Sequence, residues 1–505
     1  MRLRRICKLL KTAATENALR IDPEGVFCCR GFQQLADATQ AHILSAMLNG
    51  NGNDMASLPE ETLPAAEEPR RWTSIPPKKF LFVSVTGLCL DLAWAVKKEG
   101  HEVKMFIDDK EERDIGEGFL EKSRNWKSDV KWADVIVFDD VLGHGAYAKR
   151  LRDKGKLVVG GTPYTDRLED DREFGQEELK KHGIPTLSHR TFTDFDEAIA
   201  YVRENPASYV LKPSGETMKT LLFVGMEADG SDIVRMLETY KRAWNKAIKS
   251  IQIQRKVTGV EVAVSAFFNG TKFITPVNIN FEHKKLFPGN VGPSTGEMGT
   301  SMFWSSPNRL FNATLKKFEK TLAAEHYVGV IDLNCIVNGS GIYPLEFTPR
   351  FGYPTIHIQQ EGLATPMGEM LYNLAAGIDF ELKARKGFQV GIRLVTPPYP
   401  YGEKETFDAY SKNSAIVFKK KGQNYLDGIH LEDVKTINDE WILAGSSGVA
   451  LVVVGTGQTM RQAKLQAYGR IQNILIPNMY YRTDISDRWV EDSDKLHNWG
   501  YLREV

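Results

Sequence analysis

The sequence has few of the features that mark secreted, membrane-spanning or nucleic-acid-binding proteins. Its five cysteines are odd in number and scattered, without the spacing of a zinc site or a disulfide framework, so we expect a reduced, cytoplasmic protein. No apolar run approaches the roughly 20 residues that a membrane-spanning helix needs. Sixty-five basic residues balance 65 acidic ones, so no net charge attracts nucleic acid or an anionic membrane, although a local basic cleft is still allowed.

The length and the N-terminal composition indicate several packed units behind a leading extension. At 505 residues, with 42% hydrophobic and 26% charged side chains, the chain is globular and too long for one ordinary domain. Residues 1–20 are basic and apolar but lack an apolar core followed by a cleavage site; they form either a short amphipathic helix that docks on the body or a partner, or a solvated end. Residues 49–77 are rich in Gly, Asn, Pro and Glu, which predicts a linker. The main body therefore begins near Lys78.

A doubly wound α/β unit is predicted over residues 78–165. The run "KKFLFVSVTG" is an almost continuously apolar strand, "LDLAWAVKKEG" a helix and "HEVKMFIDD" a second strand. The short apolar runs "ADVIVFDD" and "GKLVVGG" follow, as in a parallel sheet covered by helices on both faces. Ligands of such sheets bind at the carboxyl ends of the strands, here at Gly87, Asp139 and Asp140. The stretch "SVTGLCLD" lacks the three-glycine dinucleotide fingerprint, so a nicotinamide enzyme is not expected.

A polar turn between two strands is a candidate phosphate site. A helix over 170–186 with a Gly-Ile-Pro stop is followed by a helix, a strand, the turn and another strand. Small residues let backbone N–H groups approach phosphate oxygens, and flanking lysines neutralise them; an ordinary hairpin turn is the alternative. The turn carries Lys212, Ser214, Gly215, Thr217, Lys219 and Thr220.

The next segment supplies an acid and a basic loop. In "GVEVAV", Glu261 lies among apolar neighbours, so it must be paired or bind something. Residues 281–300 hold four glycines without periodicity, which predicts a long loop of the kind that serves a site. His283, Lys284 and Lys285 near its start either hold anionic groups or form a solvated basic turn.

A hairpin at "NGSG" brings oxygen ligands together. Alternation along its two strands places Asp332 and Asn334 on the same face as Glu346 and Thr348. Two carboxylates and two neutral oxygen donors suit magnesium, which is usually bound through one or two carboxylates plus substrate phosphates. Arg350 offers a planar fork for a phosphoryl or carboxylate group. The alternative is a purely structural Glu–Arg pair.

These motifs in this order resemble the ATP-grasp fold, and specifically the phosphoribosylamine–glycine ligase family. The resemblance rests on "VLKPSGE", "GVEVAV", "EHKK", "GNVGPSTGEMGT" and "PLEFTPRFGYPT", and on "GFQVGIRLVTPPYP" and residues 448–485. It implies an α/β fold with a doubly wound pre-ATP-grasp domain over 78–165, an ATP-grasp domain over 166–385 with its nucleotide lid at about 186–255, and a small α+β domain over 386–490. Residues 491–505 are then a tail.

The resemblance also implies roles for individual residues. Lys212 and the turn after it match the ATP phosphate site, Gln254, Arg255, Lys256 and Val257 the adenine hinge, and Glu261 the ribose side. Glu346 matches the metal carboxylate; Thr348 replaces the family's usual asparagine, and Asp332 compensates. Arg350 matches the arginine near the transferring phosphoryl group, with Lys212 and Lys284 as further catalytic residues. Substrate positions are matched by His283, Lys284, Ser294, Thr295 and Gly296.

The chemistry that this resemblance implies is amide formation through an acyl phosphate. ATP and Mg²⁺, with Mn²⁺ as an alternative, activate a glycine-like amino acid that an amine then attacks. The partners are two small molecules, and the enzyme is a monomer or homodimer. The first loop, "TGLCLDLAWAV", lacks the family's Arg-Glu-His, which leaves three alternatives: phosphoribosylamine as acceptor in purine biosynthesis, another amine on a nucleotide, natural product or peptide, or a nucleotide-binding pseudoenzyme.

Overall fold

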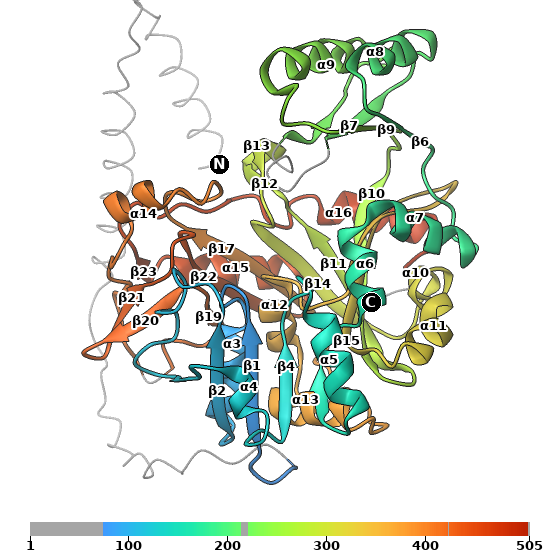
Figure 1. Ribbon diagram of the computed structural model, residues 1–505. Helices are drawn as coiled ribbons and strands as arrows, with labels where there is room; N and C mark the ends of the chain where they lie inside the picture. The colour runs from blue at the N-terminus through green and yellow to red at the C-terminus, as the bar shows by residue number, and fades with distance from the viewer. Residues whose placement is uncertain (1–73, 214–220, 423, 503–505) are drawn as a thin grey trace, which may run out of the picture. The chain divides into compact units, whose positions relative to one another are not determined.

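The computed structural model describes residues 74–213, 221–422 and 424–502. Its first unit is a parallel sheet in the order β3-β2-β1-β4-β5, with helices between the strands (Figure 1). Buried Phe80, Phe82 and Val137 make up much of its core. The prediction of a doubly wound first domain is confirmed. Its elements are β1 (Lys79–Ser84), α3 (Leu90–Lys98), β2 (Glu102–Ile107), β3 (Glu121–Lys122), α4 (Trp126–Asp129), β4 (Val135–Phe138), α5 (His144–Asp153) and β5 (Leu157–Val159).

A smaller antiparallel sheet in the order β6-β9-β7-β8 follows two capped helices. Thr162 and Asp171 cap α6 and α7 with their side chains. Helices α8 and α9 lie on one face of the sheet (Figure 1), because Ile233, Leu237 and Tyr240 form an apolar stripe along α9. The elements are α6 (Pro163–Asp170), α7 (Arg172–Lys181), β6 (His189–Phe192), α8 (Phe195–Glu204), β7 (Tyr209–Pro213), β8 (Phe223–Val224), α9 (Ser231–Trp244) and β9 (Ile251–Arg255).

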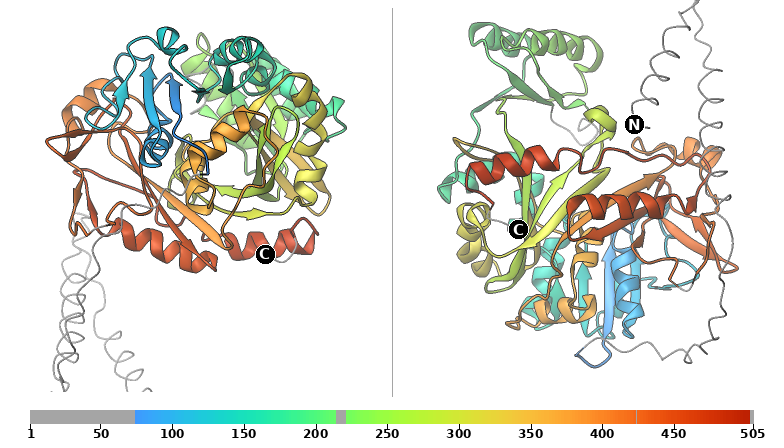
Figure 2. Two further views of the ribbon diagram at one scale, coloured as in Figure 1. Left: turned by 90° about the horizontal axis from the view of Figure 1, so that it is seen from below. Right: turned by 180° about the vertical axis from the view of Figure 1, so that it is seen from behind.

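The largest sheet has eight antiparallel strands in the order β16-β15-β10-β11-β14-β17-β22-β19. Strands from residues 386–490 therefore continue the same sheet as the strands that carry Asp332 and Glu346. Helix α15 packs against β17 and β22 (Figure 2). The strands are β10 (Val260–Asn269), β11 (Phe273–Glu282), β14 (Gly299–Ser305), β15 (Val328–Asn338), β16 (Gly341–Thr348), β17 (Phe388–Val395), β19 (Ile429–Leu431) and β22 (Val449–Gly457).

The segment predicted as a long loop, residues 281–300, is instead mostly a hairpin. Strands β12 (Lys285–Phe287) and β13 (Val291–Ser294) pair around a turn, η2 (Pro288–Asn290). Gly289 and Asn290 have φ values of 75° and 57°, which glycine and asparagine tolerate and which bring the chain back on itself. The strands are too short to show a period-2 pattern, so the glycine content hid them.

The C-terminal residues also differ from expectation. Residues 491–505 were predicted to be a tail, but α16 (Trp489–Asn498) covers part of this range, and Leu496, Tyr501 and Leu502 are buried against the core of the large sheet. The apolar spacing of a helix shorter than three turns is easily missed. The remaining elements are α10 (Arg309–Ala313), η3 (Leu315–Phe318), α11 (Glu319–Ala324), α12 (Thr355–Gly362), α13 (Met367–Ala375), α14 (Lys404–Tyr410), β18 (Val417–Phe418), β20 (Val434–Ile437), β21 (Glu440–Leu443), α15 (Met460–Ile471) and β23 (Ile474–Leu475).

In the part of the chain that the structure describes, no helix combines the length and the apolar character needed to cross a membrane.

Candidate active site

One face of the large sheet carries a cluster of acidic and amide side chains. Asn334 on β15 lies opposite Glu346 on β16, and Asp332 lies opposite Thr348. On the other side of β15, small residues of β10 face this pair of positions, with Ala263 opposite Asn334. Because Ala263 is small, polar side chains of β11 reach across β10 to those of β15.

Hydrogen bonds and ion pairs join four strands through this cluster. Asn280 Nδ2 donates to Asp332 Oδ2 at 2.9 Å. Asn334 Nδ2 donates to Glu261 Oε1 at 3.1 Å and to Glu282 Oε2 at 2.9 Å. The Asn280 and Asn334 side chains therefore hold three carboxylates on one face of the sheet.

Lys284 lies among these carboxylates. Its Nζ is 2.7 Å from Glu346 Oε1, 3.2 Å from Glu282 Oε2 and 3.5 Å from Glu261 Oε1. Although burial works against its charge, the Glu346, Glu282 and Glu261 carboxylates raise the pKa of Lys284 well above its ordinary value. In return Lys284 lowers the pKa of Glu346 to about 2. Glu346 is thus ionised at any physiological pH.

The more deeply buried acids show the opposite shift. Burial, together with the Glu282 carboxylate, raises the pKa of Asp332 well above its ordinary value. Burial likewise raises the pKa of Glu282. A cation at this face would favour the ionised forms of both acids, because opposite charge nearby stabilises a carboxylate.

The donor set fits a hard divalent cation. Carboxylate and amide oxygens are the ligands that Mg²⁺ prefers in proteins. Within the described residues, the buried Oδ1 atoms of Asn280 and Asn334 have no hydrogen-bond partner, so both are free to accept a ligand. The residues that could hold a metal ion are Asp332, Glu346 and Thr348, as the sequence predicts, together with Glu282, Asn280 and Asn334.

Lys212 lies on β7, electrostatically coupled to this cluster. Burial, and then the nearby Arg172, lower the pKa of Lys212 to about 8, while Glu346 acts in the opposite direction. Its partly desolvated ammonium group suits a phosphate. The other residues of the predicted phosphate turn, Ser214, Gly215, Thr217, Lys219 and Thr220, lie outside the described residues.

The predicted adenine hinge follows β9. Gln254 is 3% exposed and Arg255 is exposed at the strand end. Lys256 Nζ donates to the carbonyl of Gly225 at 2.7 Å, which ties the hinge to the segment after β8. Val257 is half-buried.

The predicted substrate residues divide into an accessible and a buried group. Ser294 pairs with Lys285 in the β12–β13 hairpin, and the Thr295 hydroxyl donates to the Lys284 carbonyl at 2.7 Å. Gly296 faces open space. His283, by contrast, is 3% exposed, and burial, with Arg488 and Arg482 nearby, lowers its pKa to about 3. His283 is therefore a neutral buried ring, and its assignment to the substrate site stays a prediction.

Arg350 contacts other acids than the sequence suggests. It was expected beside the metal carboxylates, but its Nη2 donates to Glu169 Oε1 at 2.9 Å and its Nε lies 3.6 Å from Asp140 Oδ1. Within the described chain no ion pair joins Arg350 to Glu346. The chain leaves β16 after Thr348, so the alternation that would keep Arg350 on the same face no longer applies.

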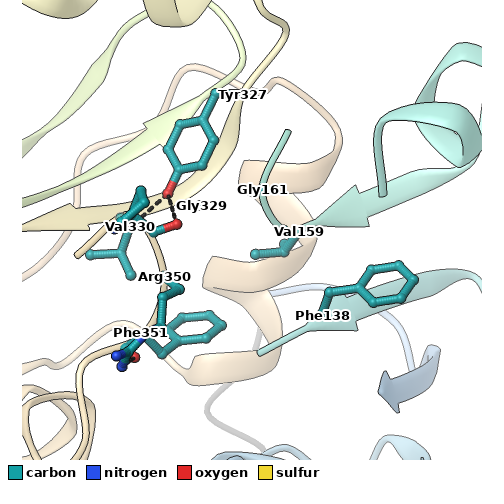
Figure 3. Close-up of a pocket in the computed structure, with 10 residues that line it drawn as sticks. Phe138, Val159, Gly161, Tyr327, Gly329, Val330, Arg350 and Phe351 are labelled. Carbon is teal, nitrogen blue, oxygen red and sulfur yellow. Dashed lines mark hydrogen bonds between the residues drawn. The ribbon is translucent and has the colours of Figure 1, made fainter. Parts of the chain in front are cut away.

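Arg350 also lines a small pocket (Figure 3). Tyr327 fixes the backbone there, because its hydroxyl donates to the carbonyls of Pro349, at 3.1 Å, and Val330. Phe138 and Gly161 bound the other side. The guanidinium thus lies between the end of β16 and the carboxyl end of β4.

The strand ends of the first sheet form the crevice that the sequence indicated. The Cys89 N–H donates to Asp139 Oδ2 at 3.2 Å, and the Gly87 N–H to the Ser84 hydroxyl at 2.8 Å. Burial, and then the adjacent Asp140, raise the pKa of Asp139 to about 7. This edge is acidic.

Several residues of the site were not identified from the sequence. Asn280 and Glu282 alternate with apolar residues in "VNINFE", and this period-2 pattern was available as a signal. Glu297 is 4% exposed and accepts a hydrogen bond from the Thr355 hydroxyl at 3.3 Å. Nothing local in the sequence marks Glu169 or Arg172.

Comparisons with known proteins agree with this arrangement. The family model described as the ATP-grasp (A) domain of phosphoribosylglycinamide synthetase matches residues 170–356. A phosphoribosylamine–glycine ligase of Listeria innocua is 25% identical over 370 residues, covering 72% of this chain and 85% of the relative. One from Streptococcus pneumoniae is 24% identical over 374 residues, covering 72% and 86%.

A solved structure extends the likeness to the fold. The crystal structure of phosphoribosylamine–glycine ligase from Thermotoga maritima superposes with a TM-score of 0.60 at 20% identity, covering 81% of this chain and all of that one. This chain therefore has the ATP-grasp fold and resembles the phosphoribosylamine–glycine ligases over most of its length.

Proposed function

We propose that this protein is an ATP-dependent ligase that activates a small amino acid, glycine or one like it, as an acyl phosphate and joins it to an amine. The observation that carries the proposal is the cluster of Glu346, Glu282, Glu261 and Asp332 around Lys284 on one face of the ATP-grasp sheet. A set of oxygen donors beside lysine side chains suits a nucleoside triphosphate and its metal ion.

ATP-grasp ligases use ATP and a divalent metal ion, and we assign that ion as Mg²⁺. When bound, it neutralises phosphate charge as the phosphoryl group transfers. Glu346 and Asp332 would hold it, with Thr348 and the free amide oxygens of Asn280 and Asn334 as neutral donors. The threonine side chain at position 348 is shorter than the asparagine it replaces. We therefore assign part of the metal coordination to the buried amide oxygens of Asn280 and Asn334.

The first chemical step is attack by the amino acid carboxylate on the γ-phosphorus of ATP. The new carboxyl O–P bond forms as the bond to the β-phosphate oxygen breaks, giving the acyl phosphate and ADP. Lys212 holds phosphate oxygens through its ammonium group. Lys284 stabilises negative charge between the carboxylate cluster and the substrate, which is electrostatic catalysis without a protein nucleophile.

The second step is attack by the amine on the acyl carbon. The C–N bond forms, the C–O bond to phosphate breaks, and the amine gives up a proton. The β12–β13 hairpin carries Ser294, Thr295 and Gly296, of which Gly296 faces open space, and we assign this side to the substrates. Arg350 would meet phosphate or a carboxylate after exchanging the Glu169 side chain for it.

Two classes of amine are candidates for the acceptor. The likeness to phosphoribosylamine–glycine ligases favours phosphoribosylamine, which places the enzyme in purine synthesis. The first loop, "TGLCLDLAWAV", favours a second candidate, an amine without a phosphate group, because it contains no basic residue or histidine to neutralise a bound phosphate.

A reducing compartment such as the cytoplasm suits this protein. Cys89 and Cys335 are both buried free thiols, which persist unpaired where thiols are kept reduced.

The test is release of inorganic phosphate from ATP by the purified full chain. Glycine plus freshly prepared phosphoribosylamine, glycine plus unphosphorylated amines, and ATP alone are compared. Product is identified by mass. Glu346→Gln should lower turnover by at least about 10²-fold, the scale expected when one electrostatic stabiliser is lost, while Glu177→Gln, on the exposed side of α7, should not.

The results of this assay distinguish the candidate functions. Turnover with phosphoribosylamine supports the purine reaction, and turnover only with unphosphorylated amines supports the second acceptor class. Nucleotide binding without turnover on any amine would contradict the ligase proposal, and full turnover by Glu346→Gln would contradict the metal assignment.

A further inference from the structure

A second cluster of metal-binding residue types lies away from the carboxylate face just described. It joins Asp91 on α3, His357 on α12 and His430 on β19, and one ligand atom from each lies within 4.8 Å of the others. Their exposed fractions are 3%, 0% and 6%. These residues come from three distant parts of the chain, so the cluster exists only in the folded protein.

Both histidines direct Nδ1 toward the same oxygen. His430 Nδ1 is 2.7 Å from Asp91 Oδ2, and His357 Nδ1 is 3.8 Å from it. Ligand atoms of a tetrahedral ion with bonds of about 2.0–2.1 Å are separated by about 3.3 Å. The His430 distance is shorter than this value, and the His357 distance is longer by a similar amount. A shift of the Asp91 carboxylate by about half an ångström would therefore bring both distances close to the tetrahedral value.

The opposite nitrogen of each ring faces a further carboxylate. His430 Nε2 is 3.4 Å from Glu361 Oε1, and His357 Nε2 is 3.7 Å from Glu432 Oε1. Glu432 is held in turn by two hydrogen bonds from Arg393, at 2.9 and 2.6 Å. Histidines that ligate a metal usually donate the other ring N–H to a carboxylate, which fixes the tautomer and the ring orientation.

Within the described residues, the buried His357 ring lacks the hydrogen bonds that a polar side chain in the interior normally makes. Among the residues that the structure describes, neither of its ring nitrogens has a hydrogen-bond partner, although the side chain is fully buried. A buried polar group without a partner is destabilising, and a metal bond to Nδ1 would supply the missing contact.

We propose that Asp91, His357 and His430 bind one divalent transition-metal ion, with Zn²⁺ as the ion that best fits their donor atoms. Two imidazoles and one carboxylate, in a small buried space, suit Zn²⁺ rather than Mg²⁺ or Ca²⁺, which take mainly oxygen ligands. The ion links α3 of the first sheet to α12 and to β19 of the large sheet. Its role is structural, and it does not depend on the ligase proposal.

The experiment uses the full chain, stripped with a chelator and titrated with Zn²⁺ in the presence of excess Mg²⁺, which occupies the oxygen-rich site. The expected results are one tightly held Zn²⁺ per chain and a higher thermal midpoint. Co²⁺ in place of Zn²⁺ should give the visible spectrum of a nitrogen-ligated, low-coordinate site.

Variants locate the ion. Asp91→Asn and His357→Gln should abolish stoichiometric Zn²⁺ binding, and Glu361→Gln should weaken it by about 10–100-fold. His189→Gln, a histidine on β6 outside the cluster, is the matched control and should bind as the native chain does. Loss of the ion in Glu346→Gln but not in His357→Gln would instead assign it to the carboxylate face and overturn the proposal.

Zn²⁺ binding by the native chain tests the proposal even if a variant does not fold. Less than one Zn²⁺ per native chain under excess Mg²⁺ overturns the site. In that case the Asp91–His430 contact is a buried ion pair and nothing more.

Discussion

Arg393 and Glu432 form a buried ion pair, and breaking it from one side should strongly lower the free energy of unfolding. Arg393 on β17 donates to both carboxylate oxygens of Glu432, at 2.9 and 2.6 Å, and the two residues are 5% and 4% exposed. Arg393 Nη1 also donates to the carbonyl of Glu297 at 3.1 Å. The pair therefore connects the end of β19 to the segment that follows the β12–β13 hairpin.

Arg393→Met removes the charge and keeps much of the volume. It leaves the Glu432 carboxylate buried without its main partner, and breaking a buried pair from one side costs about 3–5 kcal/mol. The thermal midpoint should then fall by about 3–6 °C, because the unfolding entropy grows with chain length by about 2.1 cal/mol/K per residue. Michaelis constants for the amino acid should rise as well, because the Glu297 backbone beside the proposed substrate segment loses its hydrogen bond.

The assay is thermal and urea unfolding of the native chain and three variants. The double variant Arg393→Met with Glu432→Gln should recover a large part of the loss, because no buried charge is left unpaired. Lys272→Met is the control: its partner Asp379 is 73% exposed, and exposed pairs contribute about 0–1 kcal/mol. If Arg393→Met is no less stable than Lys272→Met, or if the double variant is as unstable as the single one, the buried-charge reasoning is refuted.

Two further predictions concern the nucleotide and the metal. ATP affinity should fall as pH rises through about 8, because Lys212, whose pKa burial and Arg172 lower to about 8, loses its charge there; calorimetric titration one unit below and one above this value measures it, and Lys212→Arg should remove the decline. Thr348→Val should raise the Mg²⁺ concentration needed for half-maximal activity, while Thr348→Asn, which restores an amide oxygen at the same place, should not; equal metal requirements for all three proteins would reject Thr348 as a ligand.

The sequence was most informative where structure depends on local periodicity. Alternation along "IDLNC" and "PLEFT" is enough to put Asp332, Asn334, Glu346 and Thr348 on one face, and the observed register pairs them as expected. The continuous apolar strands of the first domain, with helices between them, likewise determine a parallel sheet. Both patterns can be recognised within individual strands, although the strands that pair, such as β1 and β4, are distant in the chain.

Contacts between distant elements were not accessible in the same way. Lys284 is paired with acids from β10, β11 and β16, and which strands adjoin is a property of the whole sheet order. Arg350 follows the same rule: its partners Glu169 and Asp140 precede it by more than 180 residues, and no local pattern connects them. The Asp91, His357 and His430 cluster was missed for this reason too.

Lys284 also explains how so acidic a face remains compatible with a nucleotide. Unpaired charges 4 Å apart interact by about 4 kcal/mol at the effective dielectric constant of a protein surface, so bare carboxylates here would repel one another and a triphosphate. The Lys284 ammonium, within 3.5 Å of three of them, offsets that repulsion in the nucleotide-free chain. A divalent cation held by Glu346 would compete with Lys284 for the carboxylate oxygens. Under the proposed function, Lys284 would then be free to stabilise negative charge on the phosphoryl group.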